Sequence, residues 1–192
     1  MTSRQRRRSD ESVPSNPVPR YYWDADVLLS YIEGQDISRL SHIRSLLDDA
    51  DDRKLEIVTS TFSIVEVAYA PVEKTSTLLD PQIEASIAAL WGSGSPVRVV
   101  ELDALIAAQA RQLVREGLAN KRRIKPGDAI HLATAMRLGA DALHTYNLKD
   151  FKRWATPTGL TICNPESSHP QMVAPPIGPS PPSSQSPTAA QT

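Results

Sequence analysis

The fold is decided by residues 21–29, YYWDADVLL, in which three aromatic residues lead into two aspartates and then into an apolar run. Aromatic residues favour a strand, and the apolar spacing that starts at Val27 is typical of a helix. A strand that leads directly into a helix begins a βα unit. Asp24 therefore falls where a strand ends, the edge at which α/β proteins gather their functional groups.

Strand-like and helix-like segments continue to alternate along the chain. Further strands are expected at 55–59, 97–102, 142–146 and 160–163, and helices at 27–32, 37–50, 61–70, 80–91, 103–117 and 126–138. Strands separated by helices imply right-handed crossovers between parallel strands. The sequence therefore predicts an α/β fold of three layers, α/β/α, with a central parallel sheet.

Residues at the helix ends refine this prediction. Thr61 can cap the helix at 61–70, and Asp103 can cap the helix that follows the third strand. Gly117 is expected to end that helix. Gly139 follows the helix at 126–138, and glycine favours the left-handed backbone that closes a helix.

The composition predicts one folded domain between two tails. Residues 1–19 are polar and rich in arginine at the start, and the last 29 residues hold 8 of the 16 prolines. Such segments bury too little apolar surface to offset the entropy of ordering. We expect a disordered arm at 1–19, a folded domain at 20–163 and a disordered tail at 164–192.

Several classes of protein are excluded by composition. The single Cys163 cannot form an internal disulfide, and no run approaches the roughly 20 apolar residues of a membrane-spanning helix. The four histidines lack zinc-like spacing, and His131 and His144 are interpreted as packing residues. We expect a cytoplasmic protein with no membrane partner.

Acidic and amide side chains fall at the joints between the expected strands and helices. They are Asp24, Glu66, Asp128, Asn147 and Asp150. Convergent oxygen ligands without His or Cys suit Mg²⁺ or Mn²⁺. Aspartates at such joints can instead cap helices, whereas Glu66, on a helix expected to be largely buried, needs a partner.

Four segments resemble, in order, the four motifs of PIN domains. They are YWDADVLL at 22–29, SIVEV at 63–67, DAIHLATA at 128–135 and TYNLKDF at 145–151. The resemblance covers 20–163 and extends to VapC-type toxins of bacterial toxin–antitoxin pairs. It implies a PIN-like sheet of four to five strands, a homodimer and a cognate antitoxin.

The resemblance also implies a catalytic role for the acids. Residues Asp24, Glu66 and Asp128 match the acids that bind one or two Mg²⁺ or Mn²⁺ ions and activate a water for attack on an RNA phosphodiester. The implied activity is that of a metal-dependent endoribonuclease. Asn147 stands where a fourth Asp is frequent, and Asp150 could supply the missing charge. Asp26 stands where a neutral residue is frequent.

Two basic clusters, at 121–125 and 149–153, lie close to these acids. Arg123, Lys125 and Lys149 could contact RNA phosphates near the metal, although a solvated loop explains them equally well.

Other functions remain open at this point. The Asn147 departure motivates an alternative function, a non-catalytic PIN-like module that binds RNA or a protein. The pair of Asp24 and Asp26 also resembles haloacid-dehalogenase phosphatases, but the Gly-Thr that follows there is absent.

Overall fold

The computed structural model describes residues 17–75 and 78–170. Most of the arm and the tail expected at the two ends, residues 1–16 and 171–192, therefore lies outside the described residues. None of the helices in the described part has the length and apolarity needed to cross a membrane.

Within the described residues, five parallel strands form one sheet in the order β3-β2-β1-β4-β5. The strands are β1 Arg20–Trp23, β2 Glu56–Ser60, β3 Val97–Val100, β4 Ala142–His144 and β5 Thr161–Cys163. In the central strand, Tyr22 pairs with Val58 of β2 and with Leu143 of β4. The chain builds outward from β1 to β3 and then returns to the other side. The switch in direction lies between β1 and β4, where α/β sheets bind ligands.

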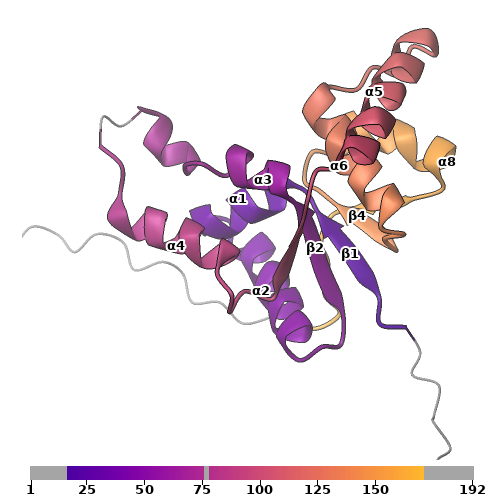
Figure 1. The fold of residues 1–192 in the computed structure, drawn as a ribbon. Coiled ribbons are helices and arrows are strands. Elements are labelled where there is room, and N and C mark those ends of the chain that lie inside the picture. The colour runs from indigo at the N-terminus through magenta and orange to yellow at the C-terminus, as the bar shows by residue number, and fades with distance from the viewer. Residues whose placement is uncertain (1–16, 76–77, 171–192) are drawn as a thin grey trace, which may run out of the picture.

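Helices cover both faces of the sheet (Figure 1). The longer ones are α1 Ala25–Glu33, α2 Ile37–Asp51, α4 Pro81–Trp91, α5 Ala104–Ala119 and α6 Pro126–Arg137. The short ones are α3 Thr61–Glu66, α7 Leu148–Phe151 and α8 Ala155–Thr158, with 3-10 helices at Pro71–Thr75 and Lys152–Trp154. Helices α1, α2 and α4 lie on one face, and α5, α6 and α8 lie on the other. The predicted three-layer fold is confirmed.

The aromatic run of β1 contributes to two cores. Successive side chains of a strand point to opposite faces of the sheet. Tyr22 packs with Leu132 and Trp154 on the face that α5 and α6 cover, whereas Trp23 packs with Ile43 on the other face. Both aromatic side chains are fully buried. The central strand is thus fixed from both sides, which positions the residue that follows it.

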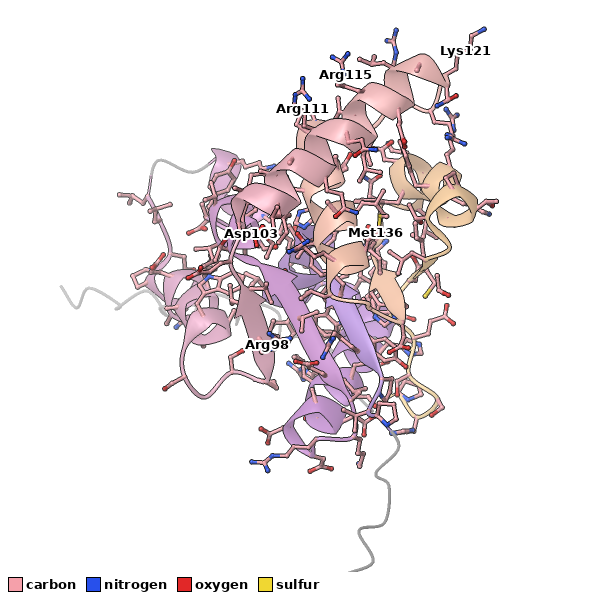
Figure 2. All side chains as sticks on the ribbon, turned by 45° about the vertical axis from the view of Figure 1, so that its right-hand side comes forward. Arg98, Asp103, Arg111, Arg115, Lys121 and Met136 are labelled. Carbon is pink, nitrogen blue, oxygen red and sulfur yellow. The ribbon has the colours of Figure 1, made fainter. Side chains whose placement is uncertain are left out.

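Helix α5 continues past Gly117, where the sequence predicted its end. Asp103 is the N-cap as expected, but the helix ends at Ala119. A Cβ atom at Gly117 would lie 2.6 Å from the carbonyl oxygen of Arg122 and 3.1 Å from the ring of Trp154. The glycine therefore serves close packing and not helix termination. Figure 2 shows α5 running from Asp103 toward Lys121.

Helix α3 is shorter than the predicted helix at 61–70 and has a different cap. The side chain of Ser60 accepts from the backbone N–H of Phe62, and the hydroxyl of Thr61 accepts instead from the backbone N–H of Leu102. The expectation of a largely buried helix is wrong, because Ile64 is 40% and Val65 71% exposed. The helix ends at Glu66, and Val67 is its C-cap.

Seven described residues continue beyond the domain end expected at 163. The backbone N–H of Ser167 donates to His42 Nδ1 at 2.9 Å, and the hydroxyl of Ser45 donates to the carbonyl oxygen of His169 at 2.9 Å. His42 and Ser45 both belong to α2. Residues 164–170 therefore extend the packed structure past β5.

We predict that Gly117→Ala destabilises the protein by about 1–3 kcal/mol, a range typical of overpacked positions. Alanine has the higher helix propensity, but the backbone of Arg122 would have to shift to admit its Cβ. Chemical denaturation measures the free energy of unfolding. Gly94→Ala is the matched control, because a Cβ there meets no described atom within 4 Å. Equal stability of the two variants would contradict the packing role of Gly117.

Candidate active site at the carboxyl edge of the sheet

Asp24 lies at the end of β1 and caps helix α1. Its Oδ1 accepts from the backbone N–H of Asp26 at 2.6 Å, and its own N–H donates to the carbonyl oxygen of His144. The residue is only 5% exposed. Burial raises the pKa of Asp24 to about 7, with the charge of Asp26 adding to the shift and His131 opposing it. The sequence allowed two interpretations of this residue, a helix cap or a metal ligand at a strand end. The structure shows the cap, and the role as a ligand stays a prediction.

Glu66, the last residue of α3, is held by a buried histidine. Its Oε2 lies 2.6 Å from His131 Nε2, and His131 Nδ1 lies 2.7 Å from the hydroxyl of Tyr22. Burial opposes a proton on His131, but the hydrogen bond to Glu66 and the charges of Asp24, Glu66 and Asp128 outweigh it and raise the pKa of His131. His131 therefore does more than pack. Its helical position in the sequence indicated burial but gave no sign of this partner.

Asp128 lies in the first turn of α6 beside Glu66. A Cβ atom at the preceding Gly127 would lie 3.2 Å from the ring of Phe62 and 3.4 Å from Oε1 of Glu66, so the glycine lets α3 and α6 approach closely. Burial raises the pKa of Asp128, and the charge of Lys125 opposes the shift. Its Oδ2 is buried and has no hydrogen-bond partner within residues 17–75 and 78–170.

Asn147 and Asp150 form a separate polar group after β4. The Asn147 side-chain amide donates to Asp150 Oδ2 at 3.0 Å, and Lys125 Nζ donates to the same oxygen at 3.3 Å. The hydrogen bond from Asn147 lowers the pKa of Asp150, and Lys125 adds to this effect despite some burial. Asp150 is thus stabilised as a carboxylate. Lys125, which the sequence predicted to contact substrate, forms an ion pair with Asp150.

Thr145 connects this group to the first strand. Its hydroxyl accepts from the backbone N–H of Asn147 at 2.9 Å. Hydrogen bonding from the same side chain also lowers the pKa of Asp24 and of Asp26, although burial, the larger effect, raises both. The end of β4 is therefore joined to the end of β1 across the switch in strand order.

The basic residues predicted to bind substrate differ in their placement. Lys149 lines a hollow together with Asp26 and Asn147. Arg123 is exposed in the loop between α5 and α6 and, among the described residues, forms no hydrogen bond or ion pair with the site acids. Sequence reasoning missed Arg39, which lines the same hollow as Lys149 and lowers the pKa of Asp26 against the effect of burial.

The structure brings Asp24, Glu66 and Asp128 to one edge of the sheet, where their charges act on one another or on His131. As placed, no three His, Cys, Asp or Glu side chains in the described part are close enough together to hold a metal ion. The donors nevertheless fit Mg²⁺ or Mn²⁺, because they are carboxylate oxygens. Burial disfavours the charges of Asp24 and Asp128, and one oxygen of Asp128 has no partner in the described part.

The fold and the site together define an α/β/α domain that has carboxylates at the switch point of its parallel sheet. The sequence pattern of the PIN domain family matches residues 21–156, well over half of the chain. The chain belongs to the PIN domain family. The resemblance found in the sequence is confirmed.

Solved structures share this fold at low sequence identity. VapBC2 from Rickettsia felis, bound to a promoter DNA fragment, is 20% identical over 76% of this chain and 98% of that chain, with a TM-score of 0.58. DNA-bound VapBC from Salmonella typhimurium is 21% identical over 76% and 97%, with a TM-score of 0.56. VapC20 from Mycobacterium tuberculosis, a sarcin–ricin loop cleaving toxin, is 14% identical over 69% and 94%, with a TM-score of 0.52. A comparison with curated proteins gives no match.

We predict that Asp24→Asn stabilises the protein at pH 8 in EDTA by about 1–4 kcal/mol. The pKa of Asp24 is higher in the folded state than in the unfolded state, so its charge opposes folding at pH 8. As the pH falls through 7, Asp24 binds its proton in the folded state before it does so in the unfolded state. The difference in the free energy of unfolding between the wild type and Asp24→Asn therefore shrinks toward pH 4. Asparagine keeps the cap of α1.

Chemical denaturation across this pH range measures the effect. Asp51→Asn, at an exposed position at the end of α2, is the control and should change stability little at any pH. A destabilised Asp24→Asn variant at pH 8 would show that the buried charge is compensated in the folded state.

Proposed function

We propose that this PIN domain is a metal-dependent endoribonuclease that hydrolyses RNA phosphodiester bonds, with Mg²⁺ or Mn²⁺ held by Asp24, Glu66 and Asp128. The proposal is carried by the group of partly or fully buried acids at the sheet edge, where Asp24 and Asp128 have raised pKa values and Asp128 Oδ2 has no partner within the described residues. Buried charges of one sign are costly without a cation, and such sites tend to be functional.

A divalent ion bound there would supply a water of lowered pKa and positive charge to offset the charge of the phosphodiester. The protein side chains have distinct tasks. Asp24 is fixed by its backbone contacts, and His131 restrains Glu66 through Oε2 while Oε1 lies beside Gly127.

The group after β4 would position substrate. Asn147 and Lys125 hold Asp150 as a carboxylate, so Asp150 can keep a water or the metal's solvent shell in place. Lys125 is exposed and close enough to Asp128 to lower its pKa, which suits contact with a phosphate at the metal. In this arrangement Asn147 serves as a donor to Asp150, and a fourth acid at its position is not needed.

We further propose that the chain acts as the toxin of a toxin–antitoxin pair, as a homodimer restrained by a cognate antitoxin in the cytoplasm. Support comes from the fold shared with VapBC complexes and with a toxin named for cleaving the sarcin–ricin loop. The RNA that this chain would cleave is a separate question, because the PIN motifs provide the acids and not the target.

Purified full-length protein is expected to cleave a labelled mixed RNA pool with Mn²⁺ or Mg²⁺ and to lose this activity in EDTA. Asp128→Asn, which retains the shape of the side chain but removes a charged ligand, should reduce the rate by at least about a hundredfold, as expected for loss of metal. Mn²⁺ should raise the melting temperature of the wild type more than that of the variant.

Asp51→Asn is the matched control, since it removes the same charge far from the site acids in sequence and at an exposed position. Cleavage by Asp128→Asn at the wild-type rate would refute the metal site. A folded wild type that binds Mn²⁺ and RNA but cuts no RNA would favour the non-catalytic binding module.

Expression of the wild type in a bacterial host should arrest growth, and Asp24→Asn should relieve the arrest, because toxicity would require an intact metal site. Colony counts after induction measure the effect, with immunoblots to show equal protein levels. If Asp24→Asn arrests growth as strongly as the wild type, the toxicity does not come from cleavage.

A further inference from the structure

A groove opens directly beside the site acids. Its first part, of about 520 Å³, is lined by Asp26 and Asn147 and by Arg39, Tyr146 and Lys149. A second hollow, of about 350 Å³, shares Arg39 and Tyr146 and continues to residues 164–166. Arg39, Tyr146 and Leu148 line both hollows, so the two hollows adjoin at these side chains, and we call them together the groove.

Arg39 and Tyr146 form a stacked pair in this groove. The guanidinium carbon of Arg39 lies 4.1 Å from the centroid of the Tyr146 ring, and its Nε lies 3.2 Å from a carboxylate oxygen of Asp36. The Arg39 side chain is 45% exposed, so a further planar group can reach the guanidinium. Unstacked nucleobases bind proteins by stacking on aromatic rings and on guanidinium planes.

The hydroxyl of Tyr146 gives a second, independent indication of a ligand. This oxygen is buried and has no hydrogen-bond partner within the described part of the chain. Buried polar atoms without a partner are uncommon and call for an explanation. A donor or acceptor on a base or ribose that enters the groove would satisfy it once Arg39 or Tyr146 adjusts.

The groove carries charges of both signs. Asp26 and Glu33 line the first hollow beside Arg39 and Lys149, and Asp36 and Glu166 line the second. Lys125 adds a further cation at Asp150, which Asn147 also contacts. Phosphates spaced along one strand match cations arranged around the acids. With acids on its walls, the groove suits an uncharged base beside Arg39 and Tyr146, with the phosphate at Lys149.

We infer that this groove binds an unstacked nucleotide of single-stranded RNA next to the phosphodiester that is cleaved. Arg39 and Tyr146 stack on the base, and Lys149 binds the adjoining phosphate. The inference rests on the proposed function for its place beside the cleaved bond. It concerns binding, however, so it can be tested without catalysis.

The experiment measures the dissociation constant of full-length protein for a short, labelled pool of random-sequence single-stranded RNA in EDTA. Arg39→Gln and Tyr146→Leu should each weaken binding about tenfold, as expected for loss of one base stack. Tyr146→Phe keeps the ring but removes the hydroxyl, so it should weaken binding by about threefold, as expected for loss of one hydrogen bond. Thermal melting shows that each variant is folded.

Arg44→Gln is the matched control, because Arg44 is an exposed arginine on the same helix that lines a different hollow. It should leave single-strand binding nearly unchanged. Duplex RNA of the same composition should bind equally to all variants, since paired bases cannot enter the groove.

Three outcomes would decide the matter. If Arg39→Gln and Tyr146→Leu bind single-stranded RNA as tightly as the wild type, the subsite is overturned. This holds even if the wild type cleaves RNA, and the proposed nuclease activity is then supported without the subsite. Weakened binding by both variants, with no cleavage by the wild type, supports the subsite and refutes the nuclease. Unchanged RNA binding with loss of a protein partner would assign the groove to that partner and overturn the inference.

Discussion

The negative charge of Asp24 must be accommodated at one of the most buried points of the chain, and much of the surrounding structure depends on this constraint. The carboxylate follows a central strand that has β2 on one side and β4 on the other, so little water reaches it. Its compensation has to come from the protein, through the backbone N–H of Asp26, the hydroxyl of Thr145 and the charge of His131. These contacts leave the pKa of Asp24 high, so the compensation is incomplete.

The incompletely compensated acids differ from the acids elsewhere in the fold. Glu56 has Arg20 and Arg98 within hydrogen-bonding range, and their contacts lower its pKa despite partial burial. Asp128, in contrast, has a buried oxygen without a partner in the described part. A protein selected for stability alone would pair or remove such a group, whereas functional sites commonly retain it at a cost in stability. This contrast separates the structural acids from the candidate ligands without reference to any relative.

The sequence predicted the fold, and that the candidate ligands would meet at one edge of the sheet, because both depend on periodic and local signals. Alternating strands and helices imply a parallel sheet, and a parallel sheet brings the residues after each strand to one edge. Gly117 shows where such reasoning fails. Glycine near the end of a helix usually indicates termination, but here the need comes from Arg122 and Trp154, whose approach only the tertiary structure defines.

The sequence showed no sign of side chains that contact each other across long sequence separations. His131 meets Tyr22 across 109 residues and Glu66 across 65, and neither separation leaves a periodic signal. The short helix α3 made Glu66 harder to interpret, because its apolar neighbours Ile64 and Val65 suggested burial and are exposed. The acids could thus be located from the sequence, but not the side chains that orient them.

The division between motif and intervening segment also bears on specificity. The four PIN-like segments contain the candidate ligands Asp24, Glu66 and Asp128, and also Asn147 and Tyr146. Arg39 lies outside them, on α2, and meets Tyr146 only because the end of β4 approaches that helix. Residues between motifs are free to vary without loss of the acids. If the groove binds RNA as proposed, its walls, which come partly from such segments, can change the preferred RNA while the candidate ligands are retained.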